Sequence, residues 1–191
     1  AAGEVSMQVP GIAAIHATTS ANALHFIFGA SGDDTTRQLA LLQAVAWQPL
    51  YRARAKPPAG LAIDALAASS TEAKGAEAVG AIFDAVSADR PRAAKLAMGY
   101  LESGGAPEAI FDAGRRFILR KGRDSHDYKF GAASWEECLL AADPKWRGPL
   151  AAAALFNLPG SKTPDSPLME RAREALKRVR GASAGNETVP T

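Results

Sequence analysis

Cysteine is almost absent from the 191-residue sequence, which contains Cys138 alone. One cysteine excludes an internal disulfide bond and a thiolate cage around a metal ion, so cysteine usage fits a cytoplasmic or a periplasmic location equally well. The acidic neighbours Glu136 and Glu137 disfavour the reactive thiolate form of this side chain. We therefore expect Cys138 to be a small core residue rather than a nucleophile.

The sequence also lacks a dominant charge and a long hydrophobic run. It has 22 Lys and Arg against 20 Asp and Glu, a net charge of +2, which is not the basic excess of a typical nucleic-acid-binding protein. The most apolar stretch, residues 11–30, is interrupted by histidine, threonine, serine and asparagine, so it does not predict a membrane span. With 47% hydrophobic and 22% charged residues, the composition is that of a soluble globular chain.

No targeting segment is visible at the start of the sequence. Residues 1–10 have neither the charged region nor the apolar run of a secretory signal peptide. Position 1 is alanine rather than methionine, so we expect either a processed chain or a part of a longer chain or complex.

Strand signals are scarce, because few windows alternate between apolar and polar residues and only 7% of residues are aromatic. Alanine, the strongest helix former, dominates instead, and glycine and proline divide the chain into helix-sized pieces. The sequence therefore predicts an all-α, multi-helical bundle of about seven to nine helices with short loops. We expect one domain over residues 1–180 and a disordered tail over 181–191. The expected helices span residues 12–28, 34–50, 63–67, 72–86, 91–102, 107–121, 124–141, 150–158 and 167–180.

The second expected helix, over residues 34–50, shows the clearest periodicity. Leu39, Leu42, Ala46 and Leu50 recur at spacings of three and four residues, which predicts one apolar stripe facing the core. Pro49 lies inside this helix and should kink or shorten it. The proline- and glycine-rich residues 56–60 that follow predict a loop.

The common sequence motifs of enzyme active sites are missing. There is no P-loop, no G-x-G-x-x-G, no G-x-S-x-G and no H-E-x-x-H. The Glu-x-x-His pattern of di-iron bundles is absent as well, because neither Glu136 nor Glu137 has a histidine three residues on. Motifs therefore assign no metal site, and the cofactor stays unknown.

Histidine occurs only at His16, His25 and His126, and these residues are the main candidates for chemistry. His16 and His25 lie nine residues apart in one expected helix, so they point to opposite faces and cannot share a metal ion. We expect His25 near the helix end or at a packing edge. His16 and His126 are therefore the more informative pair.

His16 is followed by an unusually polar run for a helix that faces a core, Ala-Thr-Thr-Ser. An apolar set lies nearer to His16 than to His25, which predicts that His16 faces the interior. This set consists of Ile12, Ile15, Ala23, Phe26 and Ile27. Thr19 and Ser20 would then be its hydrogen-bond partners or part of a ligand site. Two interpretations remain open, a core histidine with satisfied hydrogen bonds and a general base in a cavity.

A second polar segment, Asp124-Ser-His-Asp-Tyr-Lys-Phe, opens the expected helix at 124–141. Asp124 is the expected N-cap and Asp127 falls at the third helical position, as in a capping box. His126 lies in the first turn, where the helix dipole disfavours an imidazolium, so a neutral ring is available to a ligand. We expect Tyr128 and Phe130 to supply apolar walls for that ligand.

A basic cluster closes the preceding helix. One interpretation of this cluster is a solvated helix end, where cations complement the negative end of the helix dipole. The alternative is an anion-binding patch. The cluster consists of Arg115, Arg116, Arg120, Lys121 and Arg123.

The two histidine-containing segments, His16-Ala-Thr-Thr-Ser-Ala-Asn-Ala-Leu and Asp124-Ser-His-Asp-Tyr-Lys-Phe, resemble segments of the questin oxidase-like family. This resemblance covers two short windows and implies an all-helical oxygenase that cleaves an anthraquinone ring by a Baeyer–Villiger-type oxidation. It implies catalytic roles for His16, His126 and Lys129. Members of that family are considerably longer than this chain, so part of such an active site would be missing here.

Three functions follow as hypotheses. The first is a helical enzyme or enzyme fragment, leaning to an oxygenase, that binds an aromatic or apolar small molecule between His16 and His126. The second is a non-catalytic helical interaction or scaffold module with an exposed apolar patch. The third is a metal- or haem-binding helical bundle. We expect no nucleic-acid partner for any of them.

Overall fold

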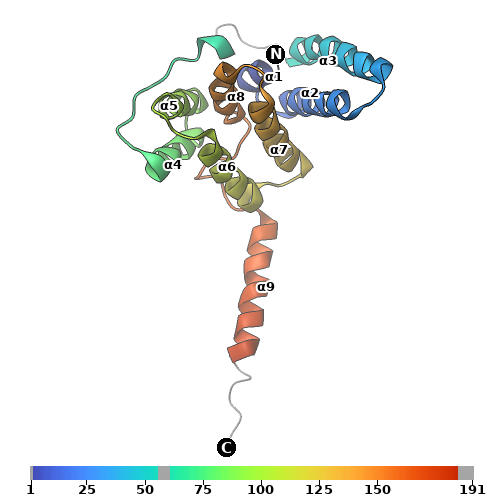
Figure 1. The fold of residues 1–191 in the computed structure, drawn as a ribbon. Coiled ribbons are helices and arrows are strands. Elements are labelled where there is room, and N and C mark those ends of the chain that lie inside the picture. Colours follow the sequence, from blue (N-terminus) through green and yellow to red (C-terminus); the bar gives the residue numbers. More distant parts are fainter. Residues whose placement is uncertain (1, 56–60, 185–191) are drawn as a thin grey trace, which may run out of the picture.

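The structure is a computed structural model that describes residues 2–55 and 61–184. Within these residues all regular structure is helical, with nine α-helices and two short 3₁₀ helices and no strand (Figure 1), which confirms the predicted all-α, multi-helical bundle. No helix in this part of the chain combines the length and hydropathy needed to cross a membrane. The α-helices are α1 Ala2–Gln8, α2 Ile12–Ala30, α3 Asp34–Ala55, α4 Gly75–Val86, α5 Arg90–Glu102, α6 Pro107–Lys121, α7 Ser125–Leu140, α8 Arg147–Ala154 and α9 Pro167–Ala184, and the 3₁₀ helices are Ile63–Ala65 and Pro144–Trp146.

Helices begin and end close to the predicted residues where the sequence has a capping residue, a proline or a glycine. Pro107 opens α6 and Gly122 caps its end, as predicted. The Asp124 carboxylate caps α7 by accepting a hydrogen bond from the backbone N–H of His126. Asp127 accepts from the backbone N–H of Arg123 at 2.8 Å, one residue earlier than in a standard capping box.

Other limits differ from the prediction. α1 was not predicted, and α3 continues past Pro49 to Ala55. α8 lies at Arg147–Ala154, earlier than the expected 150–158, and α9 continues four residues beyond the expected end. The expected loop at 56–60 and residues 185–191 of the expected tail lie outside the described residues.

The core is centred on α8, which packs against α1, α5, α6 and α7. Every residue from Ala151 to Phe156 is buried. α5 contacts α8, and the Met98 and Leu101 side chains of α5 lie beside Gly148 of α8. α5 also contributes three fully buried alanines, Ala93, Ala94 and Ala97, and such small side chains let neighbouring helix axes approach closely. The alanine content therefore serves core packing as well as helix formation. Cys138 belongs to the same core, as predicted, and burial raises the pKa of its thiol to about 11.

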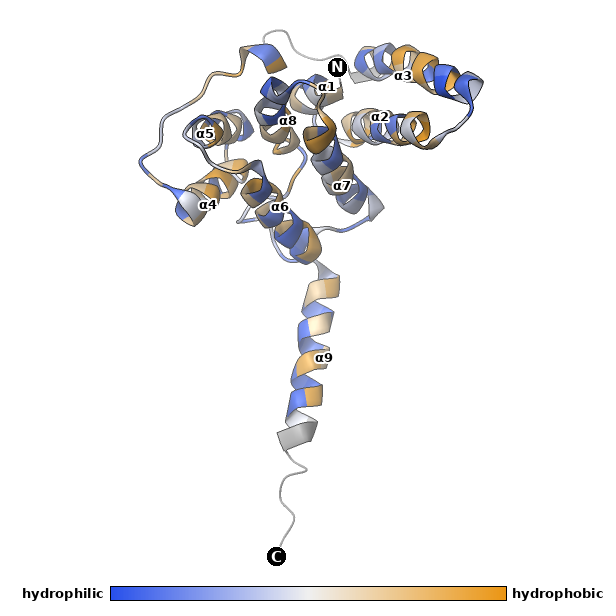
Figure 2. Ribbon diagram, in the orientation of Figure 1, coloured by the Kyte–Doolittle hydropathy of each residue, from blue (hydrophilic) through white to orange (hydrophobic). Residues whose placement is uncertain are grey.

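Helices α2 and α3 form an antiparallel hairpin at one side of the molecule (Figures 1 and 2). Their contact uses Ala40 and polar groups, including a hydrogen bond from the Gln48 side chain to the Ala17 carbonyl at 3.2 Å. The predicted core-facing stripe of α3 is therefore wrong, because Leu39, Leu42 and Leu50 face solvent, with Leu42 65% exposed. Periodicity identified an apolar face correctly, but the face that packs on α2 is a different one.

Helix α9 extends away from the other helices and is anchored at its first turn (Figure 1). The Asp165 carboxylate contacts Arg173 at 2.5 Å, Arg120 at 3.2 Å and Lys121 at 3.4 Å. The Arg173 and Arg120 guanidinium groups lower the pKa of Asp165 to about 2. Lys121 is buried and also donates to the Thr163 carbonyl. Two members of the basic cluster, Arg120 and Lys121, thus hold the segment at the start of α9.

Candidate functional site at the contact between α2 and α7

The structure brings His16 and His126 together. Their ring centroids lie 5.3 Å apart at an interplanar angle of 86°, an edge-to-face arrangement. His16 comes from α2 and His126 from the first turn of α7, and both rings are half-buried. A contact between residues so distant in the sequence depends on the packing of α2 against α7.

Asp124 orients the His126 ring. One carboxylate oxygen, Oδ1, accepts from the backbone N–H of His126 at 2.8 Å and lies 3.2 Å from its Nδ1 atom. The backbone hydrogen bond lowers the pKa of Asp124, so the carboxylate remains ionised. An ionised acceptor favours the tautomer with the proton on Nδ1, which leaves Nε2 of His126 as the basic atom.

The burial of α2 corrects the expected orientation of His16. The buried line of this helix is made of Ala14, Ile15, Ala17 and Thr18. Ile12 and Phe26, which were expected to face the core with His16, are exposed, Phe26 to 73%. α2 contacts α1, α3 and α7, and His16 lies between its buried residues and its exposed ones. The ring is therefore half-buried rather than enclosed in the core.

Thr19, Ser20 and Lys129, the polar residues predicted beside the two histidines, have different surroundings. Thr19 is half-buried one turn after His16. Ser20 is hydrogen-bonded to the Tyr51 hydroxyl at 3.0 Å, which joins α2 to α3. Lys129 is exposed on α7.

The two aromatic residues predicted as ligand walls do not face the histidine pair. Phe130 is 1% exposed and belongs to the main core. Tyr128 lines a separate cleft of about 390 Å³ between α6 and α7, together with Trp135. The pattern in the sequence placed them on one helix with His126 but did not show which elements would pack on each face of that helix.

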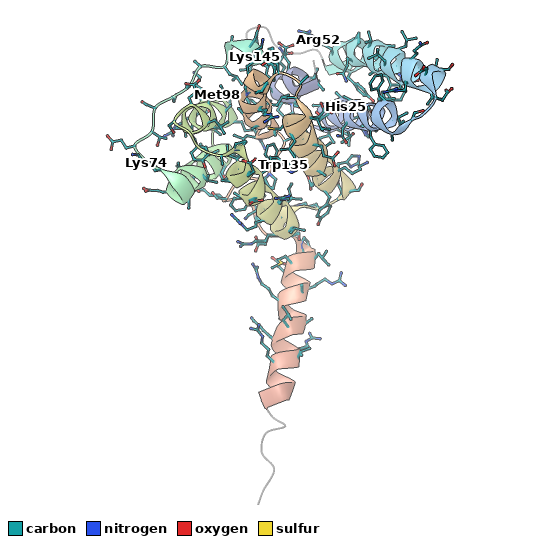
Figure 3. The ribbon with its side chains drawn as sticks, viewed as in Figure 1. His25, Arg52, Lys74, Met98, Trp135 and Lys145 are labelled. Atoms are coloured by element: carbon teal, nitrogen blue, oxygen red, sulfur yellow. The ribbon has the colours of Figure 1, made fainter. Side chains whose placement is uncertain are left out.

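A second polar cluster lies further along the same helix contact. The Asn22 side chain of α2 donates to Glu136 of α7 at 2.9 Å. Its neighbour Glu137 is half-buried and interacts electrostatically with His25, which Figure 3 shows on α2. Burial raises the pKa of Glu137, and this effect outweighs the opposing influence of His25 and Asn22. All three histidines of the chain therefore lie along this contact.

A small polar cavity adjoins Glu137. It measures about 30 Å³, which is room for at least one water molecule. Ser6, Thr18 and Ser134 line it, and the Ser6 and Thr18 hydroxyls are hydrogen-bonded to each other at 3.0 Å. Glu137 Oε1 and Ser134 Oγ are buried there without a hydrogen-bond partner. Sequence reasoning missed this cluster, because its members come from α1, α2 and α7 and share no local motif.

Glu137→Gln tests the environment of this carboxyl. Because the pKa of Glu137 is higher in the folded protein than in the unfolded chain, the folded state holds the proton more tightly. Its contribution to stability therefore falls as the pH rises from below the unfolded pKa to above the folded one. We expect the difference in urea midpoint, variant minus wild type, to increase by about 0.2–0.5 M from pH 4 to pH 7.

The exposed neighbour Glu136 provides the control. Glu136→Gln removes the same formal charge one residue away, and the Glu136 charge contributes to the raised pKa of Glu137 much less than burial does, so this variant should show a clearly smaller gain with pH. A constant difference between Glu137→Gln and wild type from pH 4 to pH 7 would show that the carboxyl is not desolvated.

The described residues contain no group of three or more His, Cys, Asp or Glu side chains arranged to hold a metal ion. Comparison of the sequence with known protein families, with curated proteins and with solved structures gives no significant match. The resemblance to the questin oxidase-like family thus stays a prediction. The function proposed below therefore rests on the residues of the site itself.

Proposed function

We propose that the chain binds an aromatic or apolar small molecule beside α2 and α7 and exchanges a proton with it through His16 and His126. The observation that carries this proposal is the contact between the two rings, with centroids 5.3 Å apart. Two of only three histidines in the chain meet, and a carboxylate orients one of them. An oriented, half-buried imidazole is the most common general base in enzymes.

Each member of the pair has a distinct role in this proposal. Asp124 holds Nδ1 of His126 and stabilises the imidazolium that forms when Nε2 accepts a proton. His16 lies edge-on to His126, where its ring donates to the ligand or takes the proton onward. Ile12 and Thr19 flank His16 on the same helix and offer the ligand one apolar and one hydroxyl contact.

Binding of 2-naphthol, an aromatic phenol, measured by calorimetry tests this proposal. We expect saturable binding to the wild type, weakened about tenfold or more by His16→Gln and by His126→Gln. His25→Gln is the matched control, because it changes the third histidine at the same helix contact and should leave the affinity unchanged. Equal affinity in all four proteins, or no saturable binding to the wild type, would refute the proposal.

The resemblance of the two histidine segments to questin oxidase-like proteins supports a more specific form of the proposal. In that form the ligand is a hydroxylated polycyclic aromatic and the pair removes its phenolic proton. Dioxygen then adds to the electron-rich ring with both of its atoms retained in the product, so the substrate itself is the reductant. Lys129 lies one turn after His126 and would hold the anion formed. Oxygen uptake with hydroxyanthraquinones, lost in His126→Gln, would support it, and ligand binding without oxygen uptake would limit the function to binding.

A second candidate function, a helical interaction module, is favoured by α3. Between Arg37 and Arg52 this helix carries no charged residue, and its outer side exposes Leu39, Leu42 and Leu50. A large exposed apolar patch commonly marks an interaction surface. The double variant Leu39→Glu/Leu42→Glu should keep its helical circular dichroism but lose binding of a hydrophobic dye, and unchanged dye binding would contradict this role.

A further inference from the structure

A cleft of about 690 Å³ opens between α4 and α6, on a different part of the molecule from the histidine pair. This volume is within the range of small-molecule binding sites. None of the residues that line it belongs to α2 or α7. A ligand in this cleft would therefore be independent of the function proposed for His16 and His126.

The floor of the cleft is apolar and aromatic. Val79 and Phe83 of α4 and Phe117 of α6 line it, and the Phe83 and Phe117 rings pack on each other with centroids 5.0 Å apart. The α4 wall includes Gly80, where an added Cβ atom would meet nothing within 4 Å. The missing side chain at Gly80 leaves this part of the cleft wall open.

A tyrosine hydroxyl without a partner also lines the cleft. Only 6% of the Tyr100 residue is exposed, and its hydroxyl makes no hydrogen bond to any described residue. The hydroxyl oxygen is not one of the buried polar atoms that lack a partner, so it is open to the cleft. It can therefore donate a hydrogen bond to an oxygen atom of a bound ligand.

Two arginines of α6, one helical turn apart, stand beside the aromatic floor. Arg120 is engaged by Asp165, whereas Arg116 makes no ion pair or hydrogen bond with any described residue. Among the described residues that line the cleft, the only acidic one is Asp112, and it is already paired with Arg115. The cleft therefore has an unneutralised guanidinium next to an apolar floor, which suits a carboxylate.

We propose that this cleft binds an apolar monocarboxylate, with its hydrocarbon part over Phe83 and Phe117 and its carboxylate at Arg116. The positive charge selects against cationic amphiphiles, and the apolar floor selects against small hydrophilic acids. The Tyr100 hydroxyl donates to an oxygen of the ligand. One part of the basic cluster of α6 thus forms an anion site, while Arg120 and Lys121 anchor α9.

Calorimetric titration with decanoate, decanol and decylammonium tests the charge preference. We expect decanoate to bind saturably, decanol about tenfold or more weakly, and decylammonium not at all. Arg116→Gln should weaken decanoate binding to the level of decanol and leave decanol unchanged. Arg115→Gln is the matched control, because its neighbouring guanidinium is paired with Asp112 and does not line the cleft.

A second variant tests the position of the hydrocarbon. Gly80→Leu places a side chain in the open space above the floor and should abolish decanoate binding without loss of folding, because leucine is a better helix former than glycine. Gly181→Leu on α9, where the space is equally open, should bind normally. Equal affinity for the three decyl compounds, or full binding by Gly80→Leu, would overturn the proposal.

Discussion

Phe130→Ala is expected to lower the free energy of unfolding by about 3–5 kcal/mol. The ring is 1% exposed and lies among the core residues that surround α8. Its loss removes buried apolar surface and leaves a cavity beside the small polar cavity at Ser134 and Glu137, where collapse would bring apolar groups against unpaired oxygens. Chemical denaturation followed by far-UV circular dichroism measures the change.

Tyr128→Ala is the companion variant, two residues away on the same helix. Tyr128 is 39% exposed, so we expect a change of only about 0.5 kcal/mol. If Phe130 were instead a ligand wall at the surface, its replacement would cost as little as that of Tyr128. Similar small losses in the two variants would therefore contradict the burial of Phe130 and return it to the candidate ligand site.

Gly99→Ala should destabilise the protein by about 3 kcal/mol, opposite in sign to the usual effect of this substitution in a helix. An added Cβ atom would overlap the carbonyl oxygen of Ser69 and come within 2.9 Å of its carbonyl carbon. These are backbone atoms, and Ser69 is held against α5 by a hydrogen bond from its N–H to the Lys95 carbonyl at 2.9 Å. The segment before α4 would have to move.

Gly80→Ala is the matched control for this prediction. Gly80 is also a helical glycine, but an added Cβ there meets nothing within 4 Å, so we expect a gain of up to about 1 kcal/mol. Thermal or urea unfolding of both variants gives the comparison. Two variants that change stability in the same direction would show that Ser69 does not pack on α5 as described.

The helices were predictable where the signal is local. Pro107 starts α6 through its fixed backbone angle, and Gly122 and Asp124 set the end of α6 and the start of α7 through hydrogen bonds to nearby residues. The sequence shows such signals directly. Helix α1 has seven residues and was not predicted. Its Val5 and Met7 are buried against other elements, so tertiary contacts stabilise it rather than local propensity.

The exposed stripe of α3 shows a second limit of sequence reasoning. The spacing of Leu39, Leu42 and Leu50 indicates an apolar face, but Leu41, Val45 and Trp47 are apolar and exposed on the same helix, and the spacing does not identify which side packs. In the structure α3 packs on α2 through a different face, which includes Ala40 and Gln48. A helix that is apolar on several sides can pack by any of them, and only the position of its neighbours decides.

The candidate site was predicted in part. His16 and His126 stand out in the sequence because histidine is scarce and both lie in polar segments, and the structure places their rings in contact. Their catalytic roles stay predictions. The Glu137 cluster could not be predicted, because its partners lie on three helices and no local spacing connects them.

A nuclear magnetic resonance titration of histidine-labelled protein tests the proposed ligand site most directly. The chain has only three histidines, so each imidazole can be followed separately and assigned from its glutamine variant. We expect the His16 and His126 signals to shift together and saturate as 2-naphthol is added, while His25 stays unchanged. Signals that do not move, or that shift equally for all three histidines, would contradict a binding site at the His16–His126 pair.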